Sequence, residues 1–231
     1  MNLLAIETST ESCSVALSCN GELISRSEFA PRRHAELLLP MCEEVLTEAG
    51  VSRRQLDVIA VGRGPGAFTG VRLAISAAQG IALALDLPVI PISSLAALAL
   101  DAPNNNHPIL AVIDARMGEI YAGTFRRDQE GLVEPLGMES VGSAAVLKVA
   151  AGQIWNVIGS GWDSYAEMIQ SRLESAPAWA QGERYPQATA IARLAAREAS
   201  SGQGLAPELA LPVYLRDKVA LTTKERQQVR N

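Results

Sequence analysis

A glycine-rich loop between two apolar runs places the strongest constraint on how this chain folds. The stretch GRGPGAFTG, residues 62–70, holds four glycines in nine residues. The residues before it, 56–62, form an apolar run of strand length, and residues 69–85 form an apolar run of helix length. This order predicts a buried strand that turns sharply through the loop into a long helix, which is the connection typical of α/β proteins.

The glycine loop has two interpretations that its spacing does not separate. Glycines before a helix let backbone N–H groups approach an anion, and the helix dipole favours negative charge there. A Walker A loop requires a lysine after the last glycines, which this loop lacks, and a dinucleotide-binding loop belongs in the first βα unit, where this loop does not lie. Two readings stay open: the phosphate loop of the actin-like kinases, which faces an early turn across a cleft, and a plain strand-to-helix turn.

The elements around the loop follow one order in each half of the chain. Three expected strands open the chain, and Asn20-Gly21 is a strong signal for a hairpin between the second and third. A helix over residues 34–50 ends at Gly50, a natural C-cap, with Pro40 either kinking it or marking its first turn. The strand, glycine loop and helix follow, and residues 87–93 predict one more strand.

The second half repeats this order less clearly. Strands are expected at 109–115, 120–127, 131–141 and 153–162, and helices at 142–152, 163–173 and 189–201. The polar, turn-rich segment near Asp101 separates the halves. We therefore predict an α/β protein with two related lobes, residues 1–101 and 102–231, whose C-terminal segment packs back on the first lobe.

Composition and charge limit the class of protein. The 231 residues are 48% hydrophobic and 19% charged, as in an ordinary globular protein, and the net charge of −5 argues against a main nucleic-acid-binding role. The apolar stretch 81–100 is interrupted by polar residues and prolines, and residues 1–10 lack the pattern of a signal peptide. We expect no membrane span and a cytoplasmic location.

Two smaller features bear on chemistry. Cys13, Cys19 and Cys42 lack CxxC spacing, so we expect small buried hydrophobic residues rather than a metal site or a disulfide framework. From Leu215 onward the tail carries a net charge of +3, through Arg216, Lys218, Lys224, Arg226 and Arg230. This tail either touches phosphates or lies in solvent as a frayed terminus.

The helix after the loop carries a row of small side chains. At helical spacing, one side presents Gly70, Ala74, Ala77, Ala78 and Ala82, with Val71 and Ile75 close by. Small residues in a row let a second helix come close, so we expect this face to bind a helix. That helix is either the one around Leu37–Leu46 or a helix of another chain.

Four motifs together resemble the TsaB (YeaZ) family, a bacterial partner in making threonylcarbamoyladenosine on tRNA. They are LLAIETSTESCSVAL from Leu3, GRGPGAFTGVRLAISAAQGIA from Gly62, VIDARMGEIY from Val112 and PVYLR from Pro212. The similarity extends nearly end to end and includes residues 34–50. It implies the actin-like ATPase (ASKHA) fold, with two lobes of mixed sheet and flanking helices.

The resemblance also implies a function. Members of the family are similar in fold to TsaD, which performs the carbamoyl transfer with a metal and an ATP-derived intermediate, but they are the non-catalytic partner. It implies pairing with a TsaD-like subunit, self-association as a homodimer, and action beside the small ATPase TsaE, with tRNA contacted only through the complex. It further implies that this chain requires no cofactor, while ATP or ADP at the partner interface stays open.

Individual residues fit the non-catalytic branch. Where the catalytic branch has two metal-binding histidines, this sequence has Ser94 and Leu98, which do not replace imidazole ligands. The early turn carries Glu7 in place of the usual Asp. The resemblance thus implies no catalytic or metal-binding residue and a degenerate phosphate loop made of Glu7, Thr8, Ser9, Gly62, Arg63, Gly64, Gly66 and Thr69. The expected partner interface is Gly70, Val71, Ala74, Ile75, Ala77, Ala78 and Ala82 with His34, Leu38 and Met41.

Two alternative functions and several single residues complete these expectations. A small ASKHA-type ATPase or phosphotransferase is the main alternative, and a peptidase has no Ser/His/Asp or HExxH pattern to support it. Arg63 and Arg72 either hold a phosphate, reach a partner carboxylate or lie in solvent. Asp114 is expected to stabilise a turn, and Arg116 to pair with Glu119.

Overall fold

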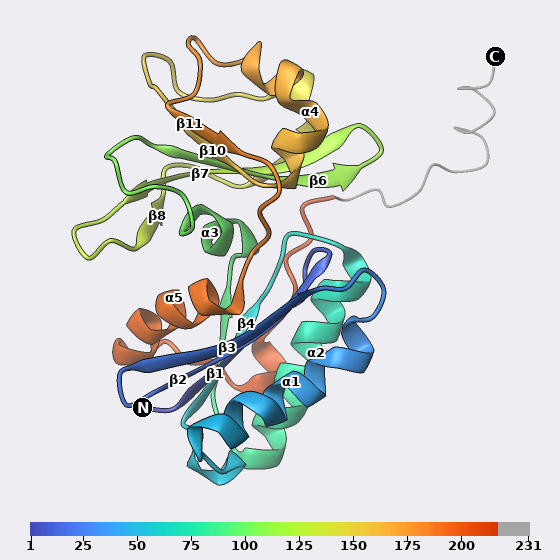
Figure 1. The fold of residues 1–231 in the computed structure, drawn as a ribbon, viewed down its shortest axis with the longest axis vertical. Coiled ribbons are helices and arrows are strands. Elements are labelled where there is room, and N and C mark those ends of the chain that lie inside the picture. The colour runs from blue at the N-terminus through green and yellow to red at the C-terminus, as the bar shows by residue number, and fades with distance from the viewer. Residues whose placement is uncertain (217–231) are drawn as a thin grey trace, which may run out of the picture.

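The computed structural model describes residues 1–216, which form two lobes, one above the other in Figure 1. Each lobe has a mixed sheet at its centre. The first sheet consists of β1 (Leu3–Glu7), β2 (Ser12–Cys19), β3 (Glu22–Phe29), β4 (Val58–Gly62) and β5 (Val89–Ile92), in the order β3-β2-β1-β4-β5. The second consists of β6 (Ile109–Arg116), β7 (Glu119–Arg127), β8 (Val133–Pro135), β9 (Ser140–Ser143), β10 (Asn156–Ile158) and β11 (Trp179–Gln181). Its order is β11-β10-β6-β7-β8, with β9 also paired to β7. The basic tail, which either touches phosphates or lies in solvent, lies outside the described residues apart from Leu215 and Arg216.

Both sheets follow the same plan of strand directions. In the first, β1–β2 and β2–β3 are antiparallel while β1–β4 and β4–β5 are parallel. In the second, β6–β7 and β7–β8 are antiparallel while β6–β10 and β10–β11 are parallel. This shared plan confirms an α/β fold of two related lobes.

Alternation along β1 builds a separate core on each face of the first sheet. Leu4 and Ile6 face a core shared with α1 (His34–Ala49) and α2 (Phe68–Leu85). Leu3 and Ala5 face a core shared with α3 (Ser94–Ala99) and α5 (Ala188–Ser200). This second core continues into the other lobe, whose sheet also packs against α4 (Ser160–Gln170). Figure 1 shows α1 and α2 on one side of the first sheet and α5 on the other.

Several local expectations hold. Asn20 and Gly21 take positive φ of 51° and 83° in the β2–β3 hairpin, and Gly50 ends α1 in the left-handed conformation. Pro40 lies inside α1, which runs continuously from His34. One expectation needs correction: among residues 1–216, α2 is long and apolar enough, by length and composition alone, to span a membrane. One of its faces packs on the first sheet.

Two more expectations differ from the structure, and a third is made more specific. Residues 142–143 belong to β9, which pairs with β7, and the rest of the expected helix 142–152 holds only the 3-10 turn Ala144–Val146. Helix α3 was not expected, because it is apolar on all sides where both lobes bury it; Ser93 caps it by accepting from the Ala96 N–H. The C-terminal segment packs back on the first lobe, as expected, and this return already begins at α5, so residues 188–210 lie with the first lobe.

Candidate functional site

The glycine loop wraps tightly around the early turn, residues 7–11, that follows β1. A Cβ on Gly62 would lie 2.0 Å from Glu7 Oε2, one on Gly66 would lie 2.3 Å from the Ser9 carbonyl oxygen, and one on Gly70 would lie 2.0 Å from the Thr8 carbonyl oxygen. Thr8 Oγ1 donates to the Gly70 carbonyl at 2.7 Å, and the Ala67 N–H donates to the Ser9 carbonyl at 2.7 Å. The glycines therefore admit the backbone of the chain's own turn.

Glu7 is fully buried beneath this loop. The Ser9 N–H donates to its Oε1 at 2.6 Å, and Ser94 Oγ donates to its Oε2 at 2.7 Å. Burial raises the pKa of the Glu7 carboxyl, and the hydrogen bonds from Ser9 and Ser94 oppose that rise only in part. The carboxylate thus joins the two segments of sequence where the catalytic branch is expected to place its aspartate and a histidine. The Leu98 side chain, at the second histidine position, is buried in the core.

A cavity of about 250 Å³ lies between the lobes, and we call it the interlobe cavity. The early turn and the start of α2 line one side of it, and the β6–β7 turn lines the other. Thr10 lines the cavity, and its buried hydroxyl has no hydrogen-bond partner among residues 1–216. Glu7 is not part of the lining, so its carboxylate is separated from the place where a ligand would sit.

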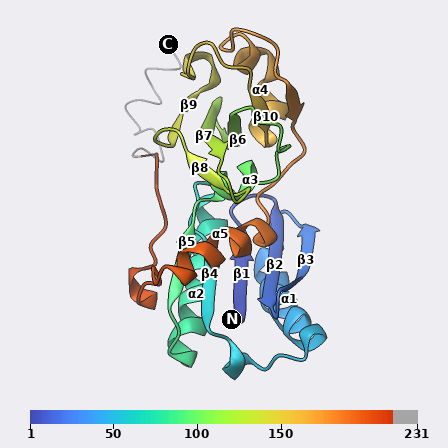
Figure 2. The ribbon, with the colours of Figure 1, turned by 90° about the vertical axis from the view of Figure 1, so that its left-hand side faces the viewer.

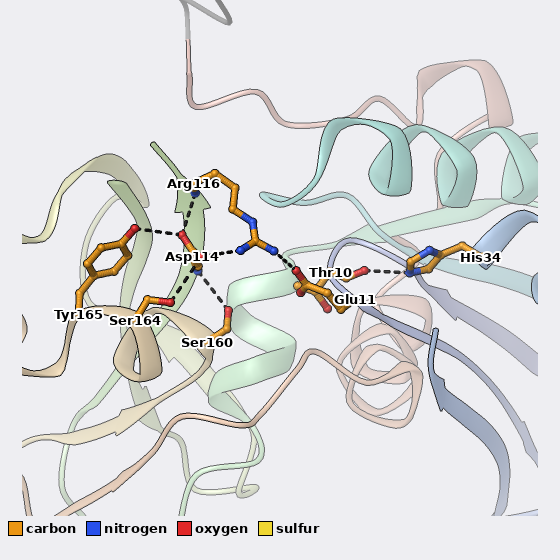
Figure 3. A network of polar contacts seen from close by, with 8 residues as sticks. All are labelled: Thr10, Glu11, His34, Asp114, Arg116, Ser160, Ser164 and Tyr165. Carbon is orange, nitrogen blue, oxygen red and sulfur yellow. Dashed lines mark hydrogen bonds and ion pairs between the residues drawn. The ribbon is translucent and has the colours of Figure 1, made fainter. Parts of the chain in front are cut away.

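Asp114 organises the second-lobe wall of this cavity (Figure 3). Its N–H donates to Ser160 Oγ at 3.1 Å, and its carboxylate accepts from the Arg116 N–H at 2.8 Å. Ser164 and Tyr165 also donate to this carboxylate, each at 3.4 Å. Asp114 therefore stabilises the turn, as expected.

Arg116 connects the lobes. Its guanidinium contacts Asp114 Oδ2 at 3.0 Å and also pairs with Glu11 of the early turn. The expected Arg116–Glu119 pair is wrong, because Arg116 has a positive φ of 62° in the β6–β7 turn and its side chain reaches across the cavity (Figure 3). Glu119 pairs instead with Arg216.

The remaining residues of the expected phosphate loop do not converge on one point. Arg63 is half-buried, its Nε has no hydrogen-bond partner among the described residues, and its backbone N–H donates to the Ile92 carbonyl. Thr69 is exposed, and Gly64 packs against Val71. Arg72 stacks over the Phe68 ring at 3.7 Å. The loop residues thus share a turn but form no common anion cradle.

A second hollow lies on the first lobe between α1 and α2, and we call it the α1/α2 groove. Its volume is about 840 Å³. Most of its lining is apolar, and Leu39 is 57% exposed although it is a large hydrophobic residue. The groove is lined chiefly by Ala35, Leu39, Pro40, Leu46, Leu73, Ser76, Ala77, Gly80, Ile81, Ala84 and Leu85. An open apolar hollow of this size on a helix pair is typical of a protein-binding surface.

The face of α2 that lines the groove is not the face that was expected to bind a partner helix. The side chains of Val71, Ala74, Ile75, Ala78 and Ala82, with Gly70, are buried against the first sheet. The expectation that these residues are available to a partner helix is therefore wrong. Ala77 is half-buried and does line the groove.

The sequence signal for the groove was present but ambiguous. Leu73, Ala77, Gly80 and Ala84 recur at helical spacing, roughly 120° around α2 from the buried row at 3.6 residues per turn. Because α2 is apolar on nearly every side, periodicity does not reveal which row meets the sheet. Both rows contain small residues, and the sheet takes the row that includes Ala74, Ala78 and Ala82.

The three α1 residues expected at the interface have different environments. Leu38 and Met41 are buried, and Leu38 also forms part of the groove floor. His34 Nε2 lies 2.9 Å from the Thr10 carbonyl oxygen and so ties the start of α1 to the early turn (Figure 3).

The cysteines are internal, as expected. All three are buried, and burial raises the pKa of the Cys13 thiol to about 11 and that of Cys42 to about 12. Such thiols carry almost no thiolate at neutral pH and are poor nucleophiles.

Comparison with known proteins places this arrangement in a class. The family model for TsaD, the tRNA N6-adenosine threonylcarbamoyltransferase, matches residues 26–222. The chain is therefore a two-lobed α/β protein related to that transferase, with an occluded early turn and an open helical groove.

Individual relatives define the family more narrowly. TsaB of Escherichia coli K12, a tRNA threonylcarbamoyladenosine biosynthesis protein, is 38% identical over 226 residues, which are 95% of this chain and 96% of that one. TsaB of Haemophilus influenzae is 36% identical over 229 residues, 95% of each chain. The structure of YeaZ from Pseudomonas aeruginosa has a TM-score of 0.86 at 43% identity and covers 93% of this chain and 99% of its own. The chain belongs to the TsaB (YeaZ) family.

Proposed function

We propose that this chain is a non-catalytic subunit in the formation of threonylcarbamoyladenosine on tRNA, in the cytoplasm. In this role it binds the TsaD-like catalytic subunit through the α1/α2 groove. The same groove supports self-association as a homodimer when that subunit is absent. Contact with tRNA, and with a TsaE-like ATPase, is made within the complex.

The open groove is the observation that carries this proposal. It presents Leu39, Leu73 and Ile81 around the small residues Ala77 and Gly80. Small residues on α2 let a partner helix approach closely, and the surrounding leucine and isoleucine side chains provide apolar area to bury. A helix pair of the partner is the element that fits such a surface.

The early turn supports a non-catalytic role over the ATPase alternative. A carboxylate that positions a metal or a water must face the ligand, whereas Glu7 is enclosed by Gly62, Ser9 and Ser94. The Ser94 hydroxyl already donates its hydrogen bond to Glu7. Any nucleotide in the assembly is therefore expected at the interface with a partner rather than on Glu7.

The test is light scattering coupled to size-exclusion chromatography, on the pure chain and on its mixture with the TsaD-like protein of the same organism. We expect a one-to-one species in the mixture, formed at the expense of the homodimer. A chain whose elution and mass are the same with and without that protein would contradict the proposal, and ATP turnover by the pure chain would favour the alternative.

Two variants of α2 localise the interaction. Gly80→Arg places a long cation in the groove at a position where a Cβ meets nothing within 4 Å, so the lobe still folds. Leu83→Arg makes the same charge change at a 63% exposed position outside the groove lining. We expect Gly80→Arg to abolish the complex and Leu83→Arg to preserve it; equal binding by both variants would place the interface elsewhere.

A further inference from the structure

The last described segment, residues 210–216, runs from the first lobe to the second without forming a helix or strand. It follows the 3-10 turn Pro207–Leu209 beside α2 and passes over the interlobe cavity. Figures 1 and 2 show it, in red, leaving the first lobe and rising toward the second. We call residues 210–216 the clasp segment.

The first-lobe end of the clasp segment is fixed to α2 and to Arg63, the residue after β4. Gln79 Nε2 donates to the Pro207 carbonyl at 3.1 Å and to the Ala210 carbonyl at 3.2 Å, and Ala210 is fully buried. The Val213 N–H donates to the Arg63 carbonyl at 2.9 Å. Backbone groups therefore hold this end against the lobe.

An aromatic contact fixes the middle of the segment at the start of α2. The Tyr214 and Phe68 rings lie 5.7 Å apart, and Arg72 stacks over Phe68. Arg72 Nε donates to the Tyr214 hydroxyl at 2.6 Å. Stacking and the hydrogen bond both act on the same tyrosine.

The other end holds the second lobe through Arg216. Its Nη2 donates to the Ala115 carbonyl at 3.1 Å and pairs with the Glu119 carboxylate. The Arg216 side chain is only 20% exposed, so this ion pair is better shielded from solvent than the Arg116–Glu11 pair, whose arginine is 70% exposed.

We propose that the clasp segment is a built-in strap that holds the two lobes closed over the interlobe cavity. It is anchored to the first lobe through Val213 and Tyr214 and to the second through Arg216, and all three line the cavity. Release of Arg216 frees the second lobe to move away from α2. The cavity, which already reaches solvent beside the exposed side chains of Phe68 and Tyr214, then widens.

The direct test measures the distance between the lobes by double electron–electron resonance. Spin labels are placed on Thr47→Cys in the first lobe and Gln153→Cys in the second, both exposed positions, while the three native cysteines are buried. Arg216→Gln removes the charge that holds Glu119. We expect its distance distribution to shift and broaden relative to the parent protein.

A matched control makes the same chemical change away from the cavity. Arg126→Gln breaks an exposed ion pair with Glu134 inside the second lobe and leaves the clasp segment intact. Glu119→Gln removes the other charge of the Arg216–Glu119 pair. An effect seen in only one of the two variants would therefore not come from loss of the pair. We expect Glu119→Gln to match Arg216→Gln and Arg126→Gln to match the parent.

Hydrogen exchange of the Val213 amide gives a second readout. Detachment of the clasp segment should accelerate its exchange at least about tenfold in Arg216→Gln. The combined reversal Arg216→Glu with Glu119→Arg should restore both the distance and the exchange rate. An unchanged interlobe distance in Arg216→Gln overturns the proposal even if exchange accelerates, because the segment would then lie on the lobes without holding them.

Discussion

Glu7 and Gly62 are in direct contact, because a Cβ on Gly62 would lie 2.0 Å from Glu7 Oε2. The loop that resembles a phosphate cradle is thus packed around a carboxylate of its own chain. In a ligand-binding loop the missing Cβ leaves room for the ligand, whereas here it leaves room for Glu7. The glycine loop fixes the start of α2 relative to β1.

This contact predicts a large effect of a single methyl group. Gly62→Ala should lower the free energy of unfolding by at least about 2 kcal/mol, because the methyl overlaps a buried carboxylate that is fixed by Ser9 and Ser94. Urea unfolding at constant pH measures the change.

A double-mutant cycle separates this overlap from a general loss of glycine at position 62. Glu7→Ala removes the carboxylate, so Gly62→Ala should cost much less in that background. Equal costs in both backgrounds would mean that the Cβ meets something other than Glu7.

Glu7 also predicts a pH dependence of stability. Burial raises the pKa of its carboxyl above the ordinary value of 4.5. The folded state therefore binds the proton more tightly than the unfolded state, and stability falls as pH rises through the folded pKa. Glu7→Gln is neutral throughout, so the stability of this variant relative to the parent should increase with pH above 4.5 and level off above the folded pKa.

Urea unfolding of both proteins at a series of pH values between 4 and 9 provides the measurement. Glu11→Gln is the matched control, since Glu11 lies on the same turn and pairs with an exposed arginine. A difference that shrinks with rising pH would show that the hydrogen bonds from Ser9 and Ser94 outweigh burial.

Sequence patterns predicted the fold well because it depends on local signals. The Asn20-Gly21 hairpin, the Gly50 cap and the strand, loop and helix around residues 58–85 all have short-range causes in turn chemistry and periodicity. Helix α3 has no such signal, because it is buried from both lobes and shows no polar face.

The sites were harder to predict because they depend on which face of an element meets its neighbours. On α2, small residues occur both toward the sheet and toward the groove, and composition does not tell them apart. The Arg216–Glu119 pair joins residues 97 positions apart, and sequence offered Arg116 as the nearer partner for Glu119. Only the arrangement of the two lobes decides between them.

The two faces of α2 predict opposite responses to a new charge. Ala78→Glu should lower the free energy of unfolding by about 3 kcal/mol or more, because a carboxylate would be buried against the sheet without a partner. Ala84→Glu lies at an exposed position in the groove and should change it by less than about 0.5 kcal/mol. Thermal and urea unfolding of both variants measure the two changes. Similar losses of unfolding free energy in Ala78→Glu and Ala84→Glu would mean that α2 does not pack on the sheet through Ala78.

Gly80 predicts a conflict between stability and binding. A Cβ at this position meets nothing within 4 Å, and a glycine inside a helix is less favourable than alanine by about 0.5–1 kcal/mol. Gly80→Ala should therefore stabilise the isolated chain by that amount. Because the added methyl stands in the groove, it should also keep a partner helix from its closest approach and weaken the proposed complex about tenfold.

Urea unfolding of the isolated chain and calorimetric titration with the TsaD-like protein measure the two effects separately. If Gly80→Ala raises stability and leaves affinity unchanged, the partner does not approach α2 at Gly80, and the groove binds through the leucine side chains alone. If stability falls, the helix at Gly80 is constrained by contacts within the chain. We expect Gly80→Ala to raise the stability of the isolated chain and to lower its affinity for the TsaD-like protein. This combination is expected if position 80 lacks a side chain because a partner helix packs against it.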